Sequence, residues 1–472
     1  MNRDQALSRI DKYFQTGEFE TELNQRIAFK TESNLPNCDD ALKSYLEKNL
    51  SPYLQELGFT CIIHSNPCAG AGPFLVAHRS EGGELPTVMT YGHGDVVAGY
   101  DDKWDDKMSP WEITKVGKRW YGRGAADNKG QHTINLASLK AVLETRGKLG
   151  FNTVVLIEMG EERGSPGLRE FCKKNKDLFN ADVFIASDGP RIAPEKPTIF
   201  MGSRGVLNFT MRLNLHAGAH HSGNWGGLLT NPGVVMAHAL ASMIDRNGKI
   251  LVEGWRNTIL SSSVRAAIAK LKVGGGENSP KINPNWGEPG MTLEERVFGS
   301  NTFEVRAFET GNPQFPANAI PSSAVAFGHL RYVVGTQPEQ LMPMLRVHLA
   351  RHGFEDIVIT SEPNPMYATR LDPNHPWVLW TVQSLTQTAG ADIAVVPNLG
   401  GSLPNDVFSE VLGLPTIWIP HSYAGCSQHA PNEHILETIS QSALKLMTGL
   451  WWDLGAGETP YLQNCLGRTT SE

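Results

Sequence analysis

The stretch Tyr91-Gly92-His93-Gly94-Asp95-Val96-Val97 follows an apolar run at 86–90 that we interpret as a buried β-strand. The predicted strand therefore ends at an imidazole, with a carboxylate two residues later. In an open α/β sheet, ligands bind in the crevice beyond the carboxyl ends of the strands. A histidine oriented by a nearby carboxylate is a common arrangement at a metal. A His-x-Asp triplet alone is also typical of a solvated loop, so the other strand ends decide its meaning.

Four further segments place polar side chains at comparable points. Apolar runs that we interpret as strands precede three of these segments, and a predicted helix follows the fourth, at Asp127. The N-terminus of a helix favours a carboxylate. Taken singly, these residues are equally compatible with turn acids, a helix cap and a solvated histidine. The polar side chains of all five segments are His93, Asp127, Glu161, Glu162, Asp188 and His429.

Together the five segments offer two imidazoles and four carboxylates. Nitrogen and oxygen ligands without thiolates suit zinc, manganese or cobalt. Two metals in such a site lie about 3.5–4 Å apart, a gap that one carboxylate can bridge. One bridge leaves each metal a histidine and a further carboxylate, and it leaves one acid to act as general base. If the segments meet at one sheet edge, they predict a dinuclear metal site.

Motifs of other enzyme classes are missing from the sequence. It contains no Gly-x-Ser-x-Gly nucleophile elbow and no His-Glu-x-x-His helix. The pair Gly122-x-Gly124 lacks the third glycine of a dinucleotide fingerprint. The histidine-rich run at 216–221 resembles a metal site, but it belongs to a different region of the chain.

Length and strand pattern predict a large insertion. A chain of 472 residues is too long for one ordinary core. Strands predicted between 206 and 369 alternate polar and apolar residues, which indicates a sheet covered on one face, whereas the other strands are almost continuously apolar. We therefore expect an α/β catalytic domain formed by 1–205 and 370–472, with an inserted α+β domain at 206–369.

Composition excludes several partners. The net charge is -7 and no basic stripe is visible, so we expect no nucleic-acid partner. No apolar run approaches the roughly 20 residues that span a bilayer, so we expect no membrane partner. The N-terminus lacks the apolar centre of a signal peptide. Six scattered cysteines, Cys465 among them, then indicate reduced thiols in a cytoplasmic protein.

Five ordered motifs resemble those of the co-catalytic metallopeptidases. They are GHGDVV at 92–97, YGRGAADNKG at 121–130, GEE at 160–162, SDG at 187–189 and HAPNE at 429–433. This family includes carnosinase-like dipeptidases, glutamate carboxypeptidase, aminoacylase, acetylornithine deacetylase and succinyl-diaminopimelate desuccinylase. The resemblance covers nearly the whole chain. It implies a zinc-peptidase-like mixed-sheet α/β sandwich with an inserted lid and dimerisation domain.

The resemblance also assigns the metal ligands. It implies that His93 and Asp188 hold one divalent metal ion and that Glu162 and His429 hold the other. Asp127 would bridge the two ions. The family implies zinc as the expected metal, with manganese or cobalt as alternatives.

Other catalytic roles follow from the same resemblance. Glu161 would be the general base, and Asp95 would orient His93. The lid segment at 221–227 is similar to the carnosinase-type motif whose histidine reaches the active site of the partner subunit. His221 would then polarise the scissile carbonyl or stabilise the oxyanion, which implies a homodimer.

Substrate-binding residues are implied as well. Arg331 resembles the lid arginine that binds a substrate carboxylate, a task suited to a planar bidentate donor. Asn318 is similar to an oxyanion contact. Gly401 and Ser402 belong to a loop, 400–404, that resembles the loop around the substrate terminus. The acid at position 188 is Asp, as in the peptidases of the family, where the deacylases carry Glu.

These features predict a metal-dependent hydrolase that cleaves the amide bond of a dipeptide or similar small peptide with a water activated between two metals. The alternative is an amidohydrolase acting on N-acyl amino acids, since the same residues serve both reactions. A catalytically inactive binding protein on the same scaffold is a third reading. The complete ligand set and the spare acid favour an enzyme.

Overall fold

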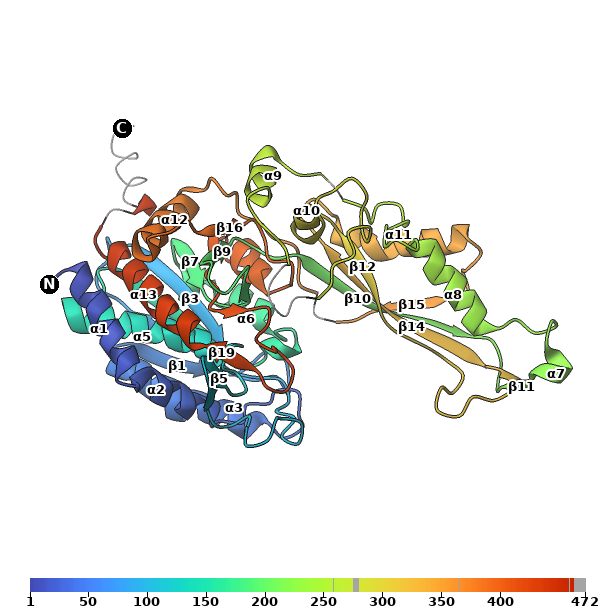
Figure 1. Ribbon diagram of the computed structural model, residues 1–472, viewed down its shortest axis with the longest axis horizontal. Helices are drawn as coiled ribbons and strands as arrows, with labels where there is room; N and C mark the ends of the chain where they lie inside the picture. The colour runs from blue at the N-terminus through green and yellow to red at the C-terminus, as the bar shows by residue number, and fades with distance from the viewer. Residues whose placement is uncertain (258, 275–279, 364, 458, 462–472) are drawn as a thin grey trace.

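The computed structural model describes residues 1–257, 259–274, 280–363, 365–457 and 459–461. The chain forms two parts that lie end to end along the long axis of the molecule (Figure 1). A large mixed sheet with helices forms one part, and a smaller antiparallel sheet with helices forms the other. The predicted fold class, an α/β catalytic domain with an inserted α+β domain, is confirmed.

The larger part is organised around an eight-stranded sheet. Its four central strands are parallel, and antiparallel pairings begin with β2 at one side and with β9 at the other. In order across the sheet the strands are β1 (Thr60–His64), β2 (Phe74–Arg79), β6 (Asn152–Glu158), β3 (Thr87–His93), β7 (Val183–Ala186), β17 (Thr416–Trp418), β9 (Thr198–Phe200) and β16 (Ala394–Val396).

Both faces of this sheet are buried, which explains why its central strands are apolar at nearly every position. Alternate residues of one strand enter different cores: Ile185 packs with the helices on one face, and Phe184 packs into the second cluster. The helices of this part are α1 (Arg3–Gln15), α2 (Glu18–Ile27), α3 (Asp39–Tyr45), η1 (Leu46–Leu50), α4 (Ser51–Glu56), α5 (Lys129–Arg146), η2 (Glu161–Arg163), α6 (Leu168–Lys174), η3 (Lys176–Phe179), α12 (Pro376–Ala389), η4 (Val407–Val411) and α13 (Glu437–Leu454).

Two small sheets lie beside the main one. A three-stranded sheet joins chain segments far apart in the sequence, and a two-stranded sheet follows the ends of β7 and β17. Their strands are β4 (Thr114–Val116), β5 (Arg119–Tyr121) and β19 (His434–Leu436), and β8 (Pro190–Arg191) and β18 (Ser422–Tyr423).

The smaller part is a four-stranded antiparallel sheet covered on one face by two helices. Strand β14 alternates between buried and half-buried residues, as a sheet covered on one face requires. The order of the strands is β12 (Thr302–Thr310), β14 (Ser323–Tyr332), β10 (Gly205–Asn214) and β15 (Val358–Ser361), and the covering helices are α8 (Pro232–Met243) and α11 (Pro338–Arg351). At its far tip lie β11 (His220–His221), α7 (Ser222–Trp225) and β13 (Ala319–Ile320).

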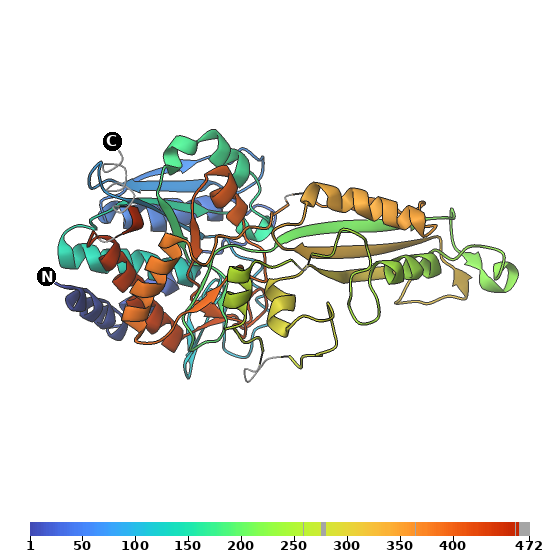
Figure 2. The same ribbon diagram turned by 90° about the horizontal axis from the view of Figure 1, so that it is seen from above.

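One segment of the inserted region packs against the larger part. Helices α9 (Ser262–Ile268) and α10 (Leu293–Phe298) lie near the large sheet in both ribbon views (Figures 1 and 2). Val264 and Phe298 belong to the same buried cluster as Val396 of β16. The predicted boundaries at 206 and 369 therefore enclose a segment that contributes to the core of the catalytic part.

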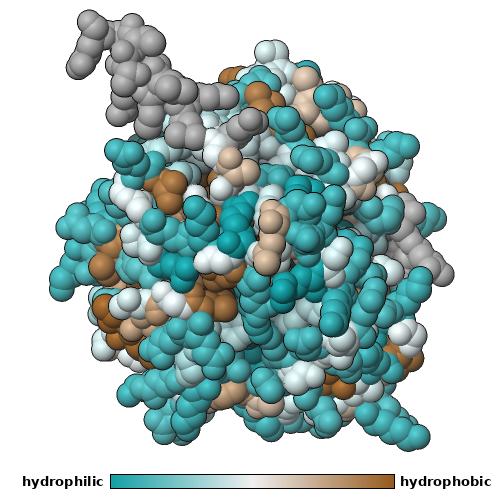
Figure 3. Space-filling model, turned by 90° about the vertical axis from the view of Figure 1, so that its left-hand side faces the viewer, coloured by the Kyte–Doolittle hydropathy of each residue, from teal (hydrophilic) through white to brown (hydrophobic). Residues whose placement is uncertain are grey.

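The outer end of the larger part, opposite the inserted sheet, is mainly hydrophilic with small scattered apolar patches (Figure 3). The buried apolar side chains form three clusters, two around the large sheet and one on the inserted sheet. None of the described helices combines the length and the apolar character needed to cross a bilayer. The five cysteines in the described ranges are free thiols, and Cys465 lies outside those ranges.

We expect Trp255→Ala to destabilise the inserted sheet. The Trp255 side chain is fully buried, packs against the rings of Phe209 and Phe303, and donates from its indole nitrogen to the Leu341 carbonyl at 2.9 Å. Loss of a buried aromatic costs about 3–5 kcal/mol. In a urea titration followed by circular dichroism, the urea concentration at the midpoint of one unfolding transition should be lower than for the wild type.

Phe315→Ala is the control, because the Phe315 side chain is 79% exposed and its removal should leave the midpoint almost unchanged. Equal midpoints for Trp255→Ala and the wild type would contradict the assignment of Trp255 to this core.

Candidate metal centre

The polar side chains predicted from the sequence gather at one edge of the large sheet. His93 is the last residue of β3, and Asp188 follows the end of β7. Glu161 and Glu162 begin the short helix η2 just after β6. Because β6, β3 and β7 are parallel neighbours, their carboxyl ends lie at the same edge. Asp127 reaches this edge from the loop before α5.

The side chains form two groups that share Asp127. One Asp127 oxygen lies 2.9 Å from His93 Nε2, and the other lies 3.0 Å from His429 Nε2. His93 Nε2 is also 3.7 Å from an oxygen of Asp188, and His429 Nε2 is 3.0 Å from an oxygen of Glu162. The ligand atoms of each group of three lie within 4.8 Å of one another, so each group can hold a metal ion.

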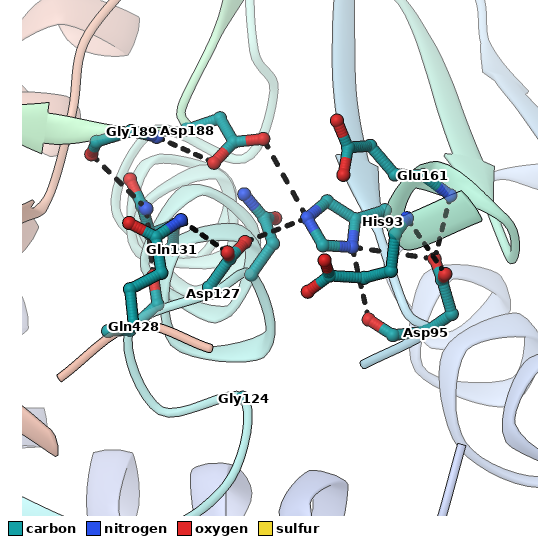
Figure 4. Close-up of polar contacts among 12 residues, drawn as sticks. His93, Asp95, Gly124, Asp127, Gln131, Glu161, Asp188, Gly189 and Gln428 are labelled. Atoms are coloured by element: carbon teal, nitrogen blue, oxygen red, sulfur yellow. Dashed lines mark hydrogen bonds and ion pairs between the residues drawn. The ribbon is translucent and has the colours of Figure 1, made fainter. Parts of the chain in front are cut away.

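The arrangement around His93 explains how one ring meets two acids. Asp127 and Asp188 approach one edge of the imidazole, and Asp95 lies at the opposite edge (Figure 4). The His93 ring is completely buried, and Asp127 and Asp188 are buried as well. The ring is thus fixed with one nitrogen directed at the carboxylates.

Electrostatics favours a cation in this cluster. Burial, together with the nearby Asp127 carboxylate, raises the pKa of Glu162 to about 7 and that of Asp188 to about 6. One oxygen of Asp188 is buried without a hydrogen-bond partner. Carboxylates this close repel one another unless positive charge compensates them. The donors, oxygen and imidazole nitrogen without sulfur, fit divalent metals such as zinc or manganese.

Glu161 stands apart from the two groups. Burial raises the pKa of its carboxyl well above the usual range, and the nearby carboxylates of Asp188 and Glu162 raise it further. Among the described residues, no hydrogen-bond or ion-pair partner contacts the Glu161 carboxylate. A free carboxylate of raised pKa beside such a cluster is suited to accept a proton.

Asp95 fixes the turn that carries the two glutamates. Its carboxylate accepts hydrogen bonds from the backbone N–H groups of Glu161 and Glu162, each at 3.1 Å, and from the Ser33 hydroxyl at 2.7 Å. His93 Nδ1 lies 3.0 Å from the backbone oxygen of Asp95 and 3.4 Å from its carboxylate. Asp95 therefore holds both the imidazole and the Glu161–Glu162 turn.

Glu433 is a structural residue of the site that sequence reasoning missed. Its buried carboxylate accepts hydrogen bonds from the backbone N–H groups of Gly124, Ala126 and Asp127 and from the Arg123 guanidinium. It thereby shapes the loop that presents Asp127. Glu433 closes the motif at 429–433, which was the available sequence signal, but spacing alone does not reveal a partner 310 residues away.

Two amides were also missed. The Gln428 side chain donates to the Asp127 oxygen that faces His429, so the loop before His429 is attached directly to the shared carboxylate (Figure 4). Asn128 donates to the backbone oxygen of Ser187 at 2.9 Å and so ties the Asp127 loop to the residue before Asp188. Asn128 lies inside the motif at 121–130, which was a sequence signal for it, whereas Gln428 lies outside the five motifs.

Three of the predicted substrate-binding residues lie together where the two parts meet. Arg331, near the end of β14, donates from Nη1 to the Ser402 hydroxyl at 2.8 Å. Gly401 precedes Ser402 in the loop that follows β16, and its backbone oxygen accepts from the Arg204 N–H at 3.1 Å.

His221 and Asn318 lie elsewhere. The backbone oxygen of Asn318 accepts hydrogen bonds from the backbone N–H and hydroxyl of Ser222, and β11 pairs with β13 at this point. Both strands are at the far tip of the inserted part, away from β3 (Figures 1 and 2). Within one chain, the structure does not bring His221 or Asn318 to the metal ligands.

Comparisons with known proteins agree with this geometry. A model of the Peptidase family M20/M25/M40 matches residues 89–453. The Beta-Ala-His dipeptidase of Homo sapiens is 35% identical over 380 residues, which cover 77% of this chain and 74% of the relative. The Cysteinylglycine-S-conjugate dipeptidase of Corynebacterium striatum is 27% identical over 399 residues, covering 81% of this chain and 83% of the relative.

A solved structure shows the same fold. The M20 family metallo-carboxypeptidase Sso-CP2 from Sulfolobus solfataricus superposes with a TM-score of 0.81 at 24% sequence identity, covering 93% of this chain and 99% of that chain. The resemblance inferred from the five motifs is thereby confirmed. This chain belongs to the peptidase family M20/M25/M40, and it is a metallopeptidase of that family.

Proposed function

We propose that this metallopeptidase hydrolyses the peptide bond of dipeptides. The observation that carries the proposal is the position of Asp127, whose two oxygens face two separate imidazole–carboxylate groups. This arrangement suits two metal ions sharing one bridging carboxylate. The dipeptidase names of the human and Corynebacterium relatives support the substrate class.

The proposed ligands follow the two groups. His93 and Asp188 would hold one ion, Glu162 and His429 would hold the other, and Asp127 would bridge them. We propose zinc as the metal, with manganese or cobalt as alternatives, because all five donors are nitrogen or oxygen atoms.

The proposed reaction gives separate roles to the bound cations, to Glu161 and to Asp95. At such a site, bound divalent cations polarise a carbonyl oxygen and lower the pKa of water. Glu161 takes a proton from the attacking water and delivers it to the nitrogen of the leaving amine. Asp95 holds the Glu161 backbone in place for both transfers, through the N–H bond at 3.1 Å.

Substrate binding is proposed to involve both parts of the molecule. Arg331 and the loop with Gly401 and Ser402 bind the substrate carboxylate, a role that the guanidinium geometry favours. We further propose a homodimer in which His221 and Asn318 of one protomer complete the active site of its partner. The exposed position of His221 at the far tip agrees with a contact outside its own chain.

Domain roles and location complete the proposal. Residues 1–205 and 370–472 form the catalytic domain, and 206–369 form the lid and dimerisation domain. A cytoplasmic location is proposed from the absence of disulfides among the described cysteines.

Metal removal tests the reaction and the substrate class together. Protein stripped with a chelator should lose activity and regain it on reloading with zinc, manganese or cobalt, because the ligand set is then refilled. Activity should be measured on dipeptides with free amines and on N-acetyl and N-succinyl amino acids.

Metal-dependent cleavage of the dipeptides alone is the expected result. Cleavage of the acyl amino acids alone would instead identify the alternative amidohydrolase. Full activity of the stripped, metal-free protein would contradict the metal mechanism.

Glu161→Gln tests the general base. The amide cannot accept a proton, so we expect kcat to fall by roughly 10²–10⁴-fold. Metal content, measured by elemental analysis, should stay at the wild-type value because Glu161 lies outside both ligand groups. Glu170→Gln, at an exposed position of α6, is the matched control and should keep full activity. Wild-type turnover by a metal-loaded Glu161→Gln enzyme would reject the assignment.

Mixed dimers test whether His221 acts across an interface. Glu161→Gln and His221→Ala should each be nearly inactive alone. When the two variants are mixed, unfolded and refolded together, half of the dimers are mixed and carry one complete site, so roughly a quarter of the wild-type activity should return. No recovery in mixed dimers isolated with two different affinity tags would exclude a role for His221 in the partner.

A further inference from the structure

The segment that crosses between the two parts is bonded to the proposed substrate loop. Residues 201–204 connect β9 to β10, and Ser203 forms an isolated β-bridge with Leu399. The Leu399 N–H donates to the Gly202 carbonyl at 2.8 Å, and the Leu403 N–H donates to the Ser203 hydroxyl at 3.3 Å. The loop that should bind the substrate terminus is therefore attached to the chain crossing.

Arg204 makes further contacts with the same loop. Its backbone N–H donates to the carbonyls of Leu399 and Gly401, at 3.2 and 3.1 Å. Its guanidinium donates from Nε to the Gly400 carbonyl at 2.7 Å and from Nη1 to the Thr302 hydroxyl at 3.1 Å. The residue is only 8% exposed, so these bonds are shielded from water. Arg204 thus fixes three consecutive residues of the loop and joins them to β12.

Ser402 links Arg204 to Arg331. The Ser402 hydroxyl donates its proton to the backbone oxygen of Arg204 at 2.6 Å. A hydroxyl has one proton and two lone pairs, so this bond leaves the oxygen to accept from Arg331 Nη1, which it does at 2.8 Å. The position of Arg204 therefore determines where Ser402 holds the Arg331 guanidinium.

The two arginines also make this corner positively charged. Among the described residues, no carboxylate lies within ion-pair distance of Arg204 or Arg331. Burial and the charge of Arg331 together lower the pKa of Arg204 to about 9, against the opposing effect of the Glu304 carboxylate. Glu304 of β12 acts on Arg204 electrostatically but lies beyond ion-pair distance of it, so the buried Arg204 and the partly buried Arg331 favour an incoming carboxylate.

We propose that Arg204 is a positioning residue for the substrate carboxylate, which it serves by holding the Gly400–Ser402 loop and, through Ser402, the Arg331 guanidinium. This inference rests on the proposed function, in which Arg331 binds the carboxylate of a dipeptide. It goes further by assigning specificity to a residue that need not touch the substrate. A purely structural role for Arg204 would instead affect all substrates alike.

The test compares two substrates in Arg204→Met, which retains an apolar stem of similar length. The first substrate is the dipeptide that the wild-type enzyme cleaves fastest, and the second is the C-terminal amide of the same dipeptide. For the free dipeptide KM should rise roughly 10-fold, as loss of a charge-assisted hydrogen bond implies, while kcat changes little. For the amide KM should match the wild-type value.

Further variants separate the proposed steps. Arg204→Lys should recover part of the affinity, because an ammonium group can still donate to Gly400 but lacks the fork that also reaches Thr302. Ser402→Ala should raise KM for the free dipeptide in the same selective way, and it keeps the proposal testable if Arg204→Met does not fold. Arg212→Met, at an exposed position of β10, the strand that follows Arg204, should behave like the wild type.

The outcomes distinguish this inference from its premise. If Arg331→Met does not change the preference for the free dipeptide over the amide, the carboxylate contact itself is wrong. If Arg331→Met abolishes that preference while Arg204→Met and Ser402→Ala affect both substrates equally, the positioning role of Arg204 is overturned. In the double variant, Arg204→Met should add no further loss to Arg331→Met, because both act on one contact.

Discussion

The structure depends on concentrating negative charge at one sheet edge. Asp127, Glu162 and Asp188 are shielded from water and face the buried His93 ring and the exposed His429 ring, and shielded carboxylates repel one another strongly. The surrounding bonds hold the cluster together despite this repulsion: Asp95 fixes the Glu161–Glu162 turn, and Glu433 fixes the loop before α5. The fold therefore holds together a cluster of carboxylates whose mutual repulsion bound cations would offset.

The acids are also placed so that the candidate metal ligands and the candidate general base are different residues. Acids that face an imidazole are arranged in two groups around Asp127, whereas the Glu161 carboxylate has no hydrogen-bond or ion-pair partner among the described residues. The same separation extends to substrate recognition, because Arg331 and Ser402 meet at the junction of the two parts and not at the cluster. Chemistry and recognition thus rest on different elements, since the acids lie at the edge of the large sheet and Arg331 belongs to the inserted sheet.

Much of this was predictable from the sequence, for a physical reason. A buried parallel strand has to be apolar throughout, so a histidine or acid at its end is conspicuous, as with His93 after β3 and Asp188 after β7. The alternating pattern of β14 likewise indicated a second, one-sided sheet. Glu433, Gln428 and Arg204 escaped prediction because their roles arise from partners distant in sequence. The α9–α10 segment was assigned to the inserted region because helical sequence does not specify which core it packs into.

That packing has a mechanical consequence. Since the segment with α9 and α10 joins the core of the catalytic part, the chain passes between the two parts four times: before β10, before α9, after α10 and after β15. Two connections would leave the inserted sheet free to rotate about them, whereas four connections restrain that rotation. The orientation of the inserted sheet, and with it the position of Arg331, is accordingly constrained by all four connections.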